Sequence, residues 1–329
     1  MPNSQTMPLV SIIIPCYNAG RFLPTCFESL EKQTYKNLHV IFINDGSSDD
    51  TLAQLQEYCA KNPNHTLLTS QNNGVGYAKR WGLQNVKGEY FTFLDSDDLI
   101  APIHIENLVK MALENNADVS CCGCAKLGEK ASQKFKFPTK LTKRVQTYNG
   151  VDAINQYLSQ EKLDFILVNK LFSTKVLKQT GATFIDCRYG EESYFCYNYL
   201  KGANKVVYSP IQTYLYVQWK SSLMHVGFNE TRLDIIKNLD LVMQDCVKNL
   251  PNSVPYVCSM RAGYTVGLLF FIKNCDYADS CVINNLLELL SNDVKQLKYC
   301  KKTAFYKRLF IPLLPPLAKS LLSKRLKQK

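Results

Sequence analysis

The sequence predicts an α/β protein whose amino-terminal part carries a covered sheet and whose carboxyl-terminal part is helical. Of the 329 residues, 46% are hydrophobic and 20% are charged, which is typical of folded proteins and excludes a disordered chain. Over residues 1–125, short β-branched runs alternate with helical stretches at the spacing of βαβ units. From residue 229 onward only helical patterns follow.

Five nearly continuous apolar runs predict strands that are buried on both faces. They lie at 9–15, 39–44, 66–70, 89–95 and 117–124, with helical patterns or helix-opening turns between them. Residues 128–146 give few signals and predict a loop or a strand excursion. The remaining expected elements are helices at 150–160, 170–179 and 191–201, short strands at 206–208 and 213–218, and helices at 230–249, 254–273 and 280–298.

These patterns divide the chain into four segments. Residues 1–125 and 126–225 are expected to form two halves of one α/β domain. Residues 226–303 are expected to form a helical region, and residues 304–329 a basic amphipathic tail.

The formal charge of +11 comes from 39 basic and 28 acidic residues, and the whole excess lies in residues 294–329. The rest of the chain is therefore formally neutral. A nucleic-acid-binding protein would line a folded face with basic residues, so we expect no nucleic-acid partner. The 13 cysteines show no paired metal-binding spacing, and we expect buried free thiols rather than disulfides or a zinc site.

The chain has no apolar run long enough to span a membrane, and its first residues lack the features of a signal peptide. We therefore expect a cytoplasmic protein. The tail at 304–329 mixes apolar and basic residues and is interrupted by prolines, which predicts short amphipathic segments lying on the anionic inner face of the cytoplasmic membrane. The alternative is that its apolar residues pack on the body and its cations face water.

Two strand-to-helix turns are expected at the same edge of the sheet. The first strand ends in PCYNAG (15–20), where an exposed Tyr17 can stack on a planar ring. The second ends in INDGSSDDT (43–51), where Asp45 can accept hydrogen bonds from a base or a ribose. Asp-Gly-Ser is also a common turn sequence, so a purely structural role is an alternative.

Two further segments point to phosphate and metal chemistry. NNGVGYAKRWGL (72–83) opens a helix whose amino terminus favours anions and carries Lys79 and Arg80 close by; solvated cations on a surface helix are the alternative. The strand at 89–95 runs into Asp95, Asp97 and Asp98. Carboxylates crowded together require a counter-charge, and Mg²⁺ or Mn²⁺ that bridges to phosphate oxygens would supply it. The alternative is that Asp97 or Asp98 caps the following helix.

These segments, taken in order with NKLFSTKVLKQTGATF and YGEESYF, resemble family 2 glycosyltransferases. The resemblance covers residues 9–222 and implies a glycosyltransferase-A fold, a Rossmann-like nucleotide-binding sandwich with a mixed central sheet. It implies that Tyr17 and Asp45 hold the uracil of a UDP-sugar, within a turn that Pro15 and Asn18 line. It also implies that Asp95 lies near the ribose. By the same resemblance, residues 1–125 form the nucleotide-sugar-binding half of the domain, and residues 126–225 form the half that binds the acceptor and carries the catalytic groups.

The resemblance assigns roles to further residues. Lys79 takes the place of the Arg in the Ala-Arg-Asn segment of the family, and Asp97 takes the metal-binding role, with Asp95 and His225 as further candidate ligands. A packing or surface role for His225 is the alternative. Glu192 stands where the family places an aspartate as catalytic base, although Glu191 and Glu192 could instead simply favour a helix amino terminus. Ser222 corresponds to the serine that follows Tyr-x-Tyr at the floor of the donor site.

The implied reaction is metal-dependent transfer of a sugar from UDP to a hydroxyl of a glycan or lipid-linked oligosaccharide, such as a lipooligosaccharide or capsule, with inversion. Two alternatives remain open. A nucleotide-sugar-binding protein without turnover would keep Asp45 and Asp97 and lack a competent base. A nucleotidyltransferase would need a basic glycine-rich phosphate loop after the first strand, and PCYNAGRF does not supply one.

Overall fold

The structure is a computed structural model that describes residues 7–141, 144–160, 162–164, 166–219, 228–275 and 279–297. The chain forms two compact units. Unit 1 comprises Met1–Ala153, Phe165–Asp186 and Asn198–Lys220, and unit 2 comprises Ile154–Asp164, Cys187–Tyr197 and Ser221–Lys329.

Unit 1 contains a nine-stranded mixed sheet in the order β3-β2-β1-β4-β8-β6-β9-β5, with β7 paired to β9. The strands are β1 (Val10–Cys16), β2 (Leu38–Asp45), β3 (Thr66–Ser70), β4 (Tyr90–Phe93), β5 (Leu99–Ile100), β6 (Val119–Gly128), β7 (Gln146–Asn149), β8 (Lys170–Ser173) and β9 (Lys205–Gln218). Strands β1 to β4 pair in parallel, whereas β8 is antiparallel to both β4 and β6. The mixed sheet agrees with the expected fold class.

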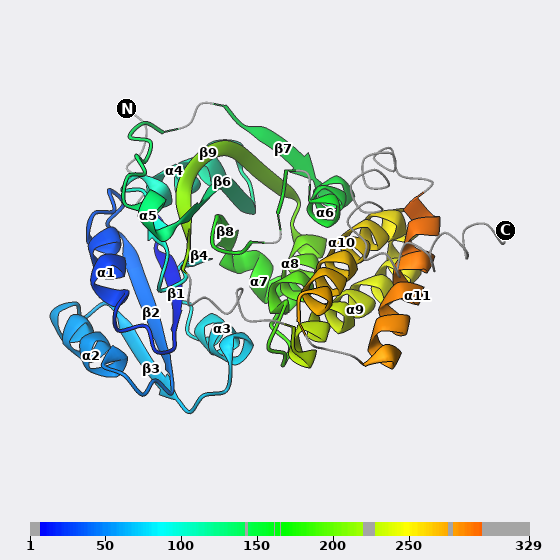
Figure 1. Cartoon of the computed structure of the whole chain (residues 1–329). Coiled ribbons are helices and arrows are strands. Elements are labelled where there is room, and N and C mark those ends of the chain that lie inside the picture. The colour runs from blue at the N-terminus through cyan, green and yellow to red at the C-terminus, as the bar shows by residue number, and fades with distance from the viewer. Residues whose placement is uncertain are drawn as a thin grey trace. The chain divides into compact units, whose positions relative to one another are not determined.

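Helices cover both faces of the parallel part of the sheet. Helices α1 (Leu23–Glu31) and α2 (Thr51–Lys61) lie on one side of β1 to β3, and α3 (Val75–Gln84) lies on the other (Figure 1). Gly82 makes the close approach of α3 possible, because an added Cβ would lie 2.4 Å from Ile13 of β1. The other helices of this unit include α4 (His104–Asn115), α5 (Glu129–Ser132) and α7 (Thr174–Thr180).

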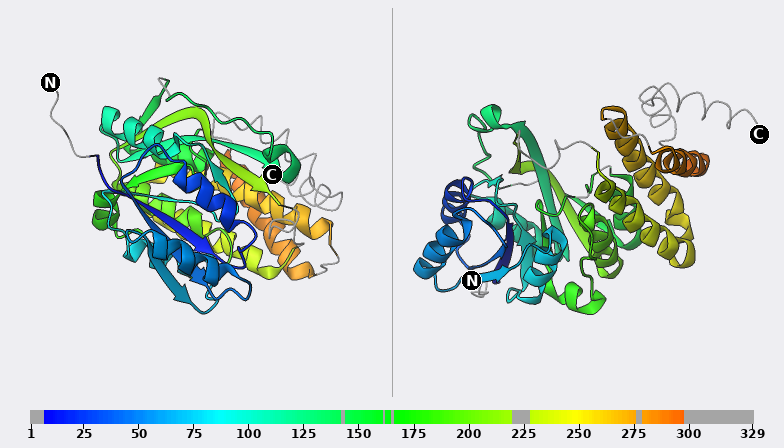
Figure 2. Two further views of the ribbon diagram at one scale, coloured as in Figure 1. Left: turned by 90° about the vertical axis from the view of Figure 1, so that its left-hand side faces the viewer. Right: turned by 60° about the horizontal axis from the view of Figure 1, so that its bottom comes forward.

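Unit 2 is helical. Helix α10 (Val254–Lys273) packs against α9 (Asp234–Asn249) and α11 (Ser280–Gln296), and Figure 2 shows the three helices together. Short 3-10 turns, η2 (Glu230–Leu233) and η3 (Pro251–Ser253), precede α9 and α10. Arg261 of α10 bridges the bundle, since its guanidinium lies 2.5 Å from Asp240 and 2.6 Å from the buried Asp293. Parts of α6 (Gly150–Ser159) and α8 (Glu191–Gly202) also belong to this unit.

Two element predictions are wrong, and both failures have a physical cause. The helix expected at 170–179 is the strand β8 followed by α7, because the short buried run at 170–173 pairs with β4 and β6. The two short strands expected at 206–208 and 213–218 form one strand, β9. Pro210 suggested a break, but the ladder shifts register beside it, where an added Cβ on Gly123 would lie 2.6 Å from the Pro210 carbonyl oxygen.

Several predictions fall outside the described residues: the roles of Ser222 and His225, and the whole tail at 304–329. Within the part of the chain that the structure describes, no helix has the length and apolar character needed to cross a membrane. The cysteines described are free thiols, and those on the inner strands, such as Cys16, Cys121 and Cys122, are buried as expected.

Candidate functional site

The candidate site lies where the strand order of the sheet reverses. Strand β1 pairs with β2 on one side and with β4 on the other, so the turns that follow these three strands meet at one edge. Pairing with β4 ends at Ile13, which leaves Pro15 without a ladder partner on that side and makes proline acceptable there.

The turn after β1 carries an exposed aromatic ring on a tightly held backbone. Tyr17 has 54% of its surface exposed. Asn18 adopts a left-handed conformation (φ 48°), and its Oδ1 accepts a hydrogen bond from the Ser48 backbone N–H at 2.8 Å. The Asn18 backbone N–H donates to Ser47 Oγ at 3.0 Å. The turns after β1 and β2 are therefore fastened together beside Tyr17.

Asp45, at the end of β2, is 4% exposed and joins two loops. Its Oδ1 accepts hydrogen bonds from Ser70 Oγ and from the Asn73 backbone N–H, both at 2.9 Å. Its Oδ2 accepts one from the Gly74 backbone N–H at 2.8 Å, immediately before α3. A carboxylate has about four acceptor positions, so these three bonds leave about one for a ligand.

Replacing Asp45 with Asn should destabilise unit 1. The amide group would turn a donor toward a backbone N–H that now has an acceptor, which costs about 1–3 kcal/mol for a buried unsatisfied group. Urea denaturation measures this loss, with Asp152→Asn, an exposed position on α6, as the charge-matched control. Equal stability of Asp45→Asn and the control would contradict the loop-joining role.

The two cations of the third segment have different environments. Lys79 is only 2% exposed, on the face of α3 that also buries Ala78 and Gly82. Arg80 forms an ion pair with Asp186, with 2.5 Å between Nη1 and Oδ1, and its guanidinium lies 5.5 Å from the Tyr77 ring centroid. Arg80 is thus committed to a contact within unit 1, and the diphosphate-binding role of Lys79 stays a prediction.

The three carboxylates after β4 differ in their burial and in their hydrogen-bond partners. Asp98 is buried and structural: its Oδ2 accepts a hydrogen bond from Tyr214 Oη at 2.7 Å and its Oδ1 accepts one from the Val217 backbone N–H at 2.8 Å. Asp95 and Asp97 are half-buried. Neither Asp97 nor Asp98 caps the next helix, because α4 begins at His104 and has no side-chain cap bond.

The electrostatics of this cluster favour a cation. Burial raises the pKa of Asp97, and the nearby charge of Arg21 opposes that rise. Burial, together with the charges of Asp95 and Asp97, holds the pKa of Asp98 well above its usual range. Among the residues described, no three His, Cys, Asp or Glu groups form a metal cluster. Mg²⁺, however, often binds one or two carboxylates together with substrate phosphates, and the hard oxygens of Asp95 and Asp97 fit that mode.

An aromatic and cationic group borders Asp97 and was not identified from the sequence. The Trp219 Nε1–H donates to the Asp97 backbone carbonyl at 3.0 Å, and the Trp219 and Phe22 ring centroids are 4.7 Å apart. The Arg21 guanidinium lies 4.3 Å from the Phe22 ring centroid. The only sequence signals were their positions, since Arg21 shares the turn of Tyr17 and Trp219 directly follows β9.

The predicted acidic pair lies in unit 2, in the first turn of α8. Glu191 is 6% exposed and Glu192 is half-buried. Burial, with the charge of Glu192 as the next cause, raises the pKa of Tyr264 well above its usual range. The charge of the Glu192 carboxylate therefore acts on the Tyr264 hydroxyl of α10.

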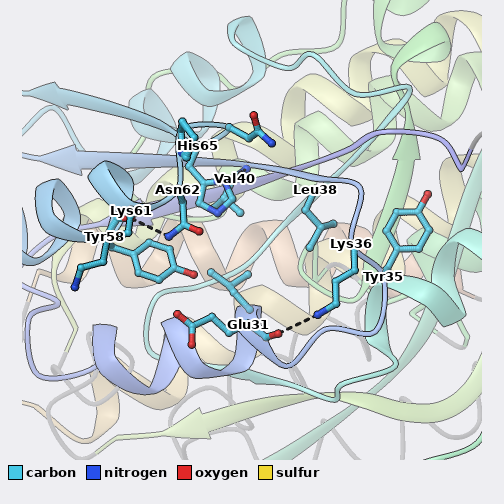
Figure 3. A pocket seen from close by; sticks show the side chains of 12 residues that line it. Glu31, Tyr35, Lys36, Leu38, Val40, Tyr58, Lys61, Asn62 and His65 are labelled. Carbon is cyan, nitrogen blue, oxygen red and sulfur yellow. Dashed lines mark hydrogen bonds between the residues drawn. The ribbon is translucent and has the colours of Figure 1, made fainter.

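A cavity of about 260 Å³ lies at the opposite end of β2 from Asp45. It is lined by the start of β2, at Leu38 and Val40, and by the last residues of α1 and α2 with their following turns (Figure 3). His65 borders it and accepts a hydrogen bond from the Val40 backbone N–H at its Nδ1, at 3.5 Å. The cavity lies at the first residues of β2 and Asp45 is the last residue of this strand, so the cavity is not part of the candidate site.

Comparison with known proteins identifies the family. The sequence model described as "Glycosyl transferase family 2" matches residues 11–181, more than half of the chain. The chain belongs to glycosyl transferase family 2. This family 2 glycosyltransferase is 29% identical to GlyA of Streptococcus pneumoniae, in an alignment that covers 66% of the present chain. It is 28% identical to YibD of Escherichia coli, in an alignment that covers 65% of the present chain. The matched regions span only 32% of GlyA and 62% of YibD.

Solved structures agree with the glycosyltransferase-A fold. Residues 1–349 of Staphylococcus aureus TarS, in complex with UDP-GlcNAc, superpose with a TM-score of 0.58 at 17% identity, covering 95% of this chain and 83% of that one. The Pyrobaculum calidifontis mannosyltransferase PcManGT, in complex with GDP-Man and Mn²⁺, gives 0.50 at 15% identity, covering 96% and 87%. At these identities the likeness supports the fold alone.

Proposed function

We propose that this glycosyltransferase moves a sugar from a uridine diphosphate donor to a hydroxyl group of a glycan or lipid-linked acceptor, with inversion at the anomeric carbon. The observation that carries the proposal is that the turns after β1, β2 and β4 lie at one edge of the sheet, with the first two joined by hydrogen bonds. Asn18 binds the turn after β2, and the charge of Arg21 acts on Asp97 after β4. The UDP-GlcNAc complex of TarS, which shares the fold, supports a uridine donor.

Each donor group has a proposed partner. The exposed Tyr17 ring stacks on uracil, and Asp45 accepts the uracil N–H at its remaining acceptor position. Pro15 and Asn18 shape that turn, and Asp95 receives a ribose hydroxyl. Lys79 and the amino terminus of α3 favour the diphosphate, since a helix amino terminus attracts anions. Ser222 would line the floor of the donor site.

In the transfer step, Glu192 is the proposed base. The acceptor oxygen attacks the anomeric carbon from the face opposite the diphosphate, its proton passes to the Glu192 carboxylate, and the bond to UDP breaks. A positioned base of this kind contributes about 10²-fold to 10⁴-fold. Mg²⁺ or Mn²⁺, held by Asp97 with Asp95 and with His225 as a further candidate ligand, would supply charge neutralisation at the diphosphate. The Mn²⁺ complex of PcManGT supports a divalent ion.

Measurement of UDP release from a panel of nucleotide sugars tests the reaction class. We expect release from a UDP-sugar that rises with a glycan acceptor and a divalent ion. Tight UDP-sugar binding without turnover under any acceptor would indicate a binding protein, and pyrophosphate release from a triphosphate would indicate a nucleotidyltransferase. Either outcome contradicts the proposal.

The proposal includes docking of residues 304–329 on the inner face of the cytoplasmic membrane, where a lipid-linked acceptor would be presented. This segment combines apolar residues with Lys and Arg and contains no Asp or Glu. Each cation near an anionic leaflet contributes about 1 kcal/mol. We expect the full chain to cosediment with anionic vesicles at low salt and a chain truncated after Lys302 to lose binding. Equal binding of both forms would overturn the docking proposal.

A further inference from the structure

The segment that leads into α8 is held by the start of α9. Asn238 of α9 is 1% exposed, and its Nδ2 donates hydrogen bonds to the Gly190 carbonyl at 2.9 Å and to the Tyr189 carbonyl at 3.4 Å. The same nitrogen lies 3.4 Å from Cys187 Sγ. The two N–H groups of one buried amide are thus shared among three acceptors within residues 187–190, which directly precede Glu191 and Glu192. All of these residues belong to unit 2.

The backbone at this point has little freedom to move. Gly190 has a φ of 75°, and an added Cβ would lie 2.3 Å from the Ile235 Cδ1 of α9. Its carbonyl also accepts a hydrogen bond from Ser193 Oγ at 2.7 Å, within the first turn of α8. Asp234 Oδ2 accepts a hydrogen bond from the Arg188 backbone N–H at 3.1 Å. The turn before α8 is therefore bound on both sides of Gly190.

A buried cation adds a third contact to the same segment. Arg232 is 3% exposed, and its guanidinium lies 5.1 Å from the Tyr189 ring centroid and 4.3 Å from the Phe271 ring centroid of α10. Cation–π contacts strengthen when they are removed from water. Residues of η2 and α9 thus converge on the four residues 187–190, and Phe271 of α10 packs against the Arg232 guanidinium.

We propose that Asn238 is a positioning residue for Glu192, and that the helices after residue 228 serve the transfer step by fixing the first turn of α8. This inference rests on the proposed role of Glu192 as base. A base must lie within hydrogen-bonding reach of the acceptor hydroxyl, and a displacement of about 1 Å can cost ~10²-fold in rate. The Asn238 amide fixes the turn at 187–190, and this turn sets the position of the Glu192 carboxylate in the first turn of α8.

The test uses the full chain with Asn238→Ala and Asn238→Asp. The second variant keeps the side-chain volume and presents a carboxylate to the two carbonyls, so it separates the hydrogen bonds from packing. We expect both to lower kcat for transfer by about 10-fold to 100-fold and to leave the dissociation constant for the UDP-sugar within about twofold. Asn249→Ala, on the same helix but bonded at the surface to Asp245, is the matched control and should keep wild-type kcat.

A double-mutant cycle with Glu192→Gln gives the decisive readout. If Asn238 acts through Glu192, Asn238→Ala should lower the rate of the Glu192→Gln enzyme less than twofold. The inference would be overturned, with the proposed base intact, if the fold-losses in kcat of the two single variants multiplied in the double variant. It would also be overturned if Asn238→Ala alone kept wild-type kcat. Retention of transfer by Glu192→Gln alone would contradict the base and the inference together. Should neither Asn238 variant fold, Asp234→Ala, which removes the acceptor of the Arg188 N–H, enters the same cycle with the same criteria.

Discussion

Asp97→Asn should lower sugar transfer by at least ~10²-fold while the protein remains folded. An amide keeps the shape of the side chain and removes the charge that would hold a divalent ion against the diphosphate, and groups that stabilise developing charge contribute about 10²-fold to 10³-fold each. The fold should survive because the buried contacts to β9 are made by Asp98 and not by the Asp97 side chain. Initial rates of UDP release with saturating acceptor measure the effect.

A second measurement on Asp97→Asn does not depend on activity. Mn²⁺ or Mg²⁺ should raise the melting temperature of the wild-type protein in the presence of UDP, since a ligand that binds the native state stabilises it. The shift should be small in Asp97→Asn and unchanged in Asp152→Asn, which removes an exposed carboxylate of α6. Equal activity of the wild-type enzyme with and without divalent ions would show that the metal assignment is wrong.

Glu192→Gln should strongly lower the rate of transfer and keep the affinity for the donor. Removing a proton acceptor raises the energy of the transition state more than that of the bound substrates, so kcat should fall by about 10²-fold to 10⁴-fold with little change in donor binding. Single-turnover transfer and isothermal titration with the UDP-sugar in the absence of acceptor measure the two quantities. Glu288→Gln, at an exposed position of α11, is the control.

The length of the side chain at position 192 is a separate question. Related enzymes that the sequence resembles carry an aspartate there, and Glu192→Asp tests whether this site needs the extra methylene. We expect a substantial loss, because the carboxylate of the shorter residue would end about one bond length from its present place. A Glu192→Gln enzyme with near wild-type turnover would instead move the base to Glu191 or Asp186.

The parallel half of the sheet could be predicted from sequence because its strands carry their own signal. The runs at 9–15, 39–44 and 66–70 agree with β1, β2 and β3 to within a residue or so at each end. Strand β8 could not be predicted, because four residues are too few to show a period and its pairing with β4 and β6 is a long-range event. Strand β9 was divided because a bulge that accommodates Pro210 depends on the partner strand.

The candidate site shows the same division between local and long-range information. The positions of Tyr17 and Asp45 at one edge follow from the strand ends, and the structure brings their turns together through Asn18 and Ser48. The burial of Asp98 did not follow, because its partners on β9 lie more than a hundred residues away along the chain. Adjacent carboxylates look alike in a sequence, and only their partners separate a structural one from a candidate ligand.

The hydrogen bonds of Asp45 have a consequence for segment exchange between relatives. The loop at 70–74 depends on an acceptor that another part of the chain supplies, and Gly46 lies so close to this loop that an added Cβ would be 2.6 Å from the Asn72 backbone nitrogen. If a chimera imported only one of these loops from a relative, the N–H and O–H donors of residues 70–74 would face an acceptor from a different protein. The loop at 70–74 could also meet a side chain at position 46, where the present structure has room only for glycine. Residues 44–47 and 70–74 therefore form one transferable module, although 22 residues lie between them.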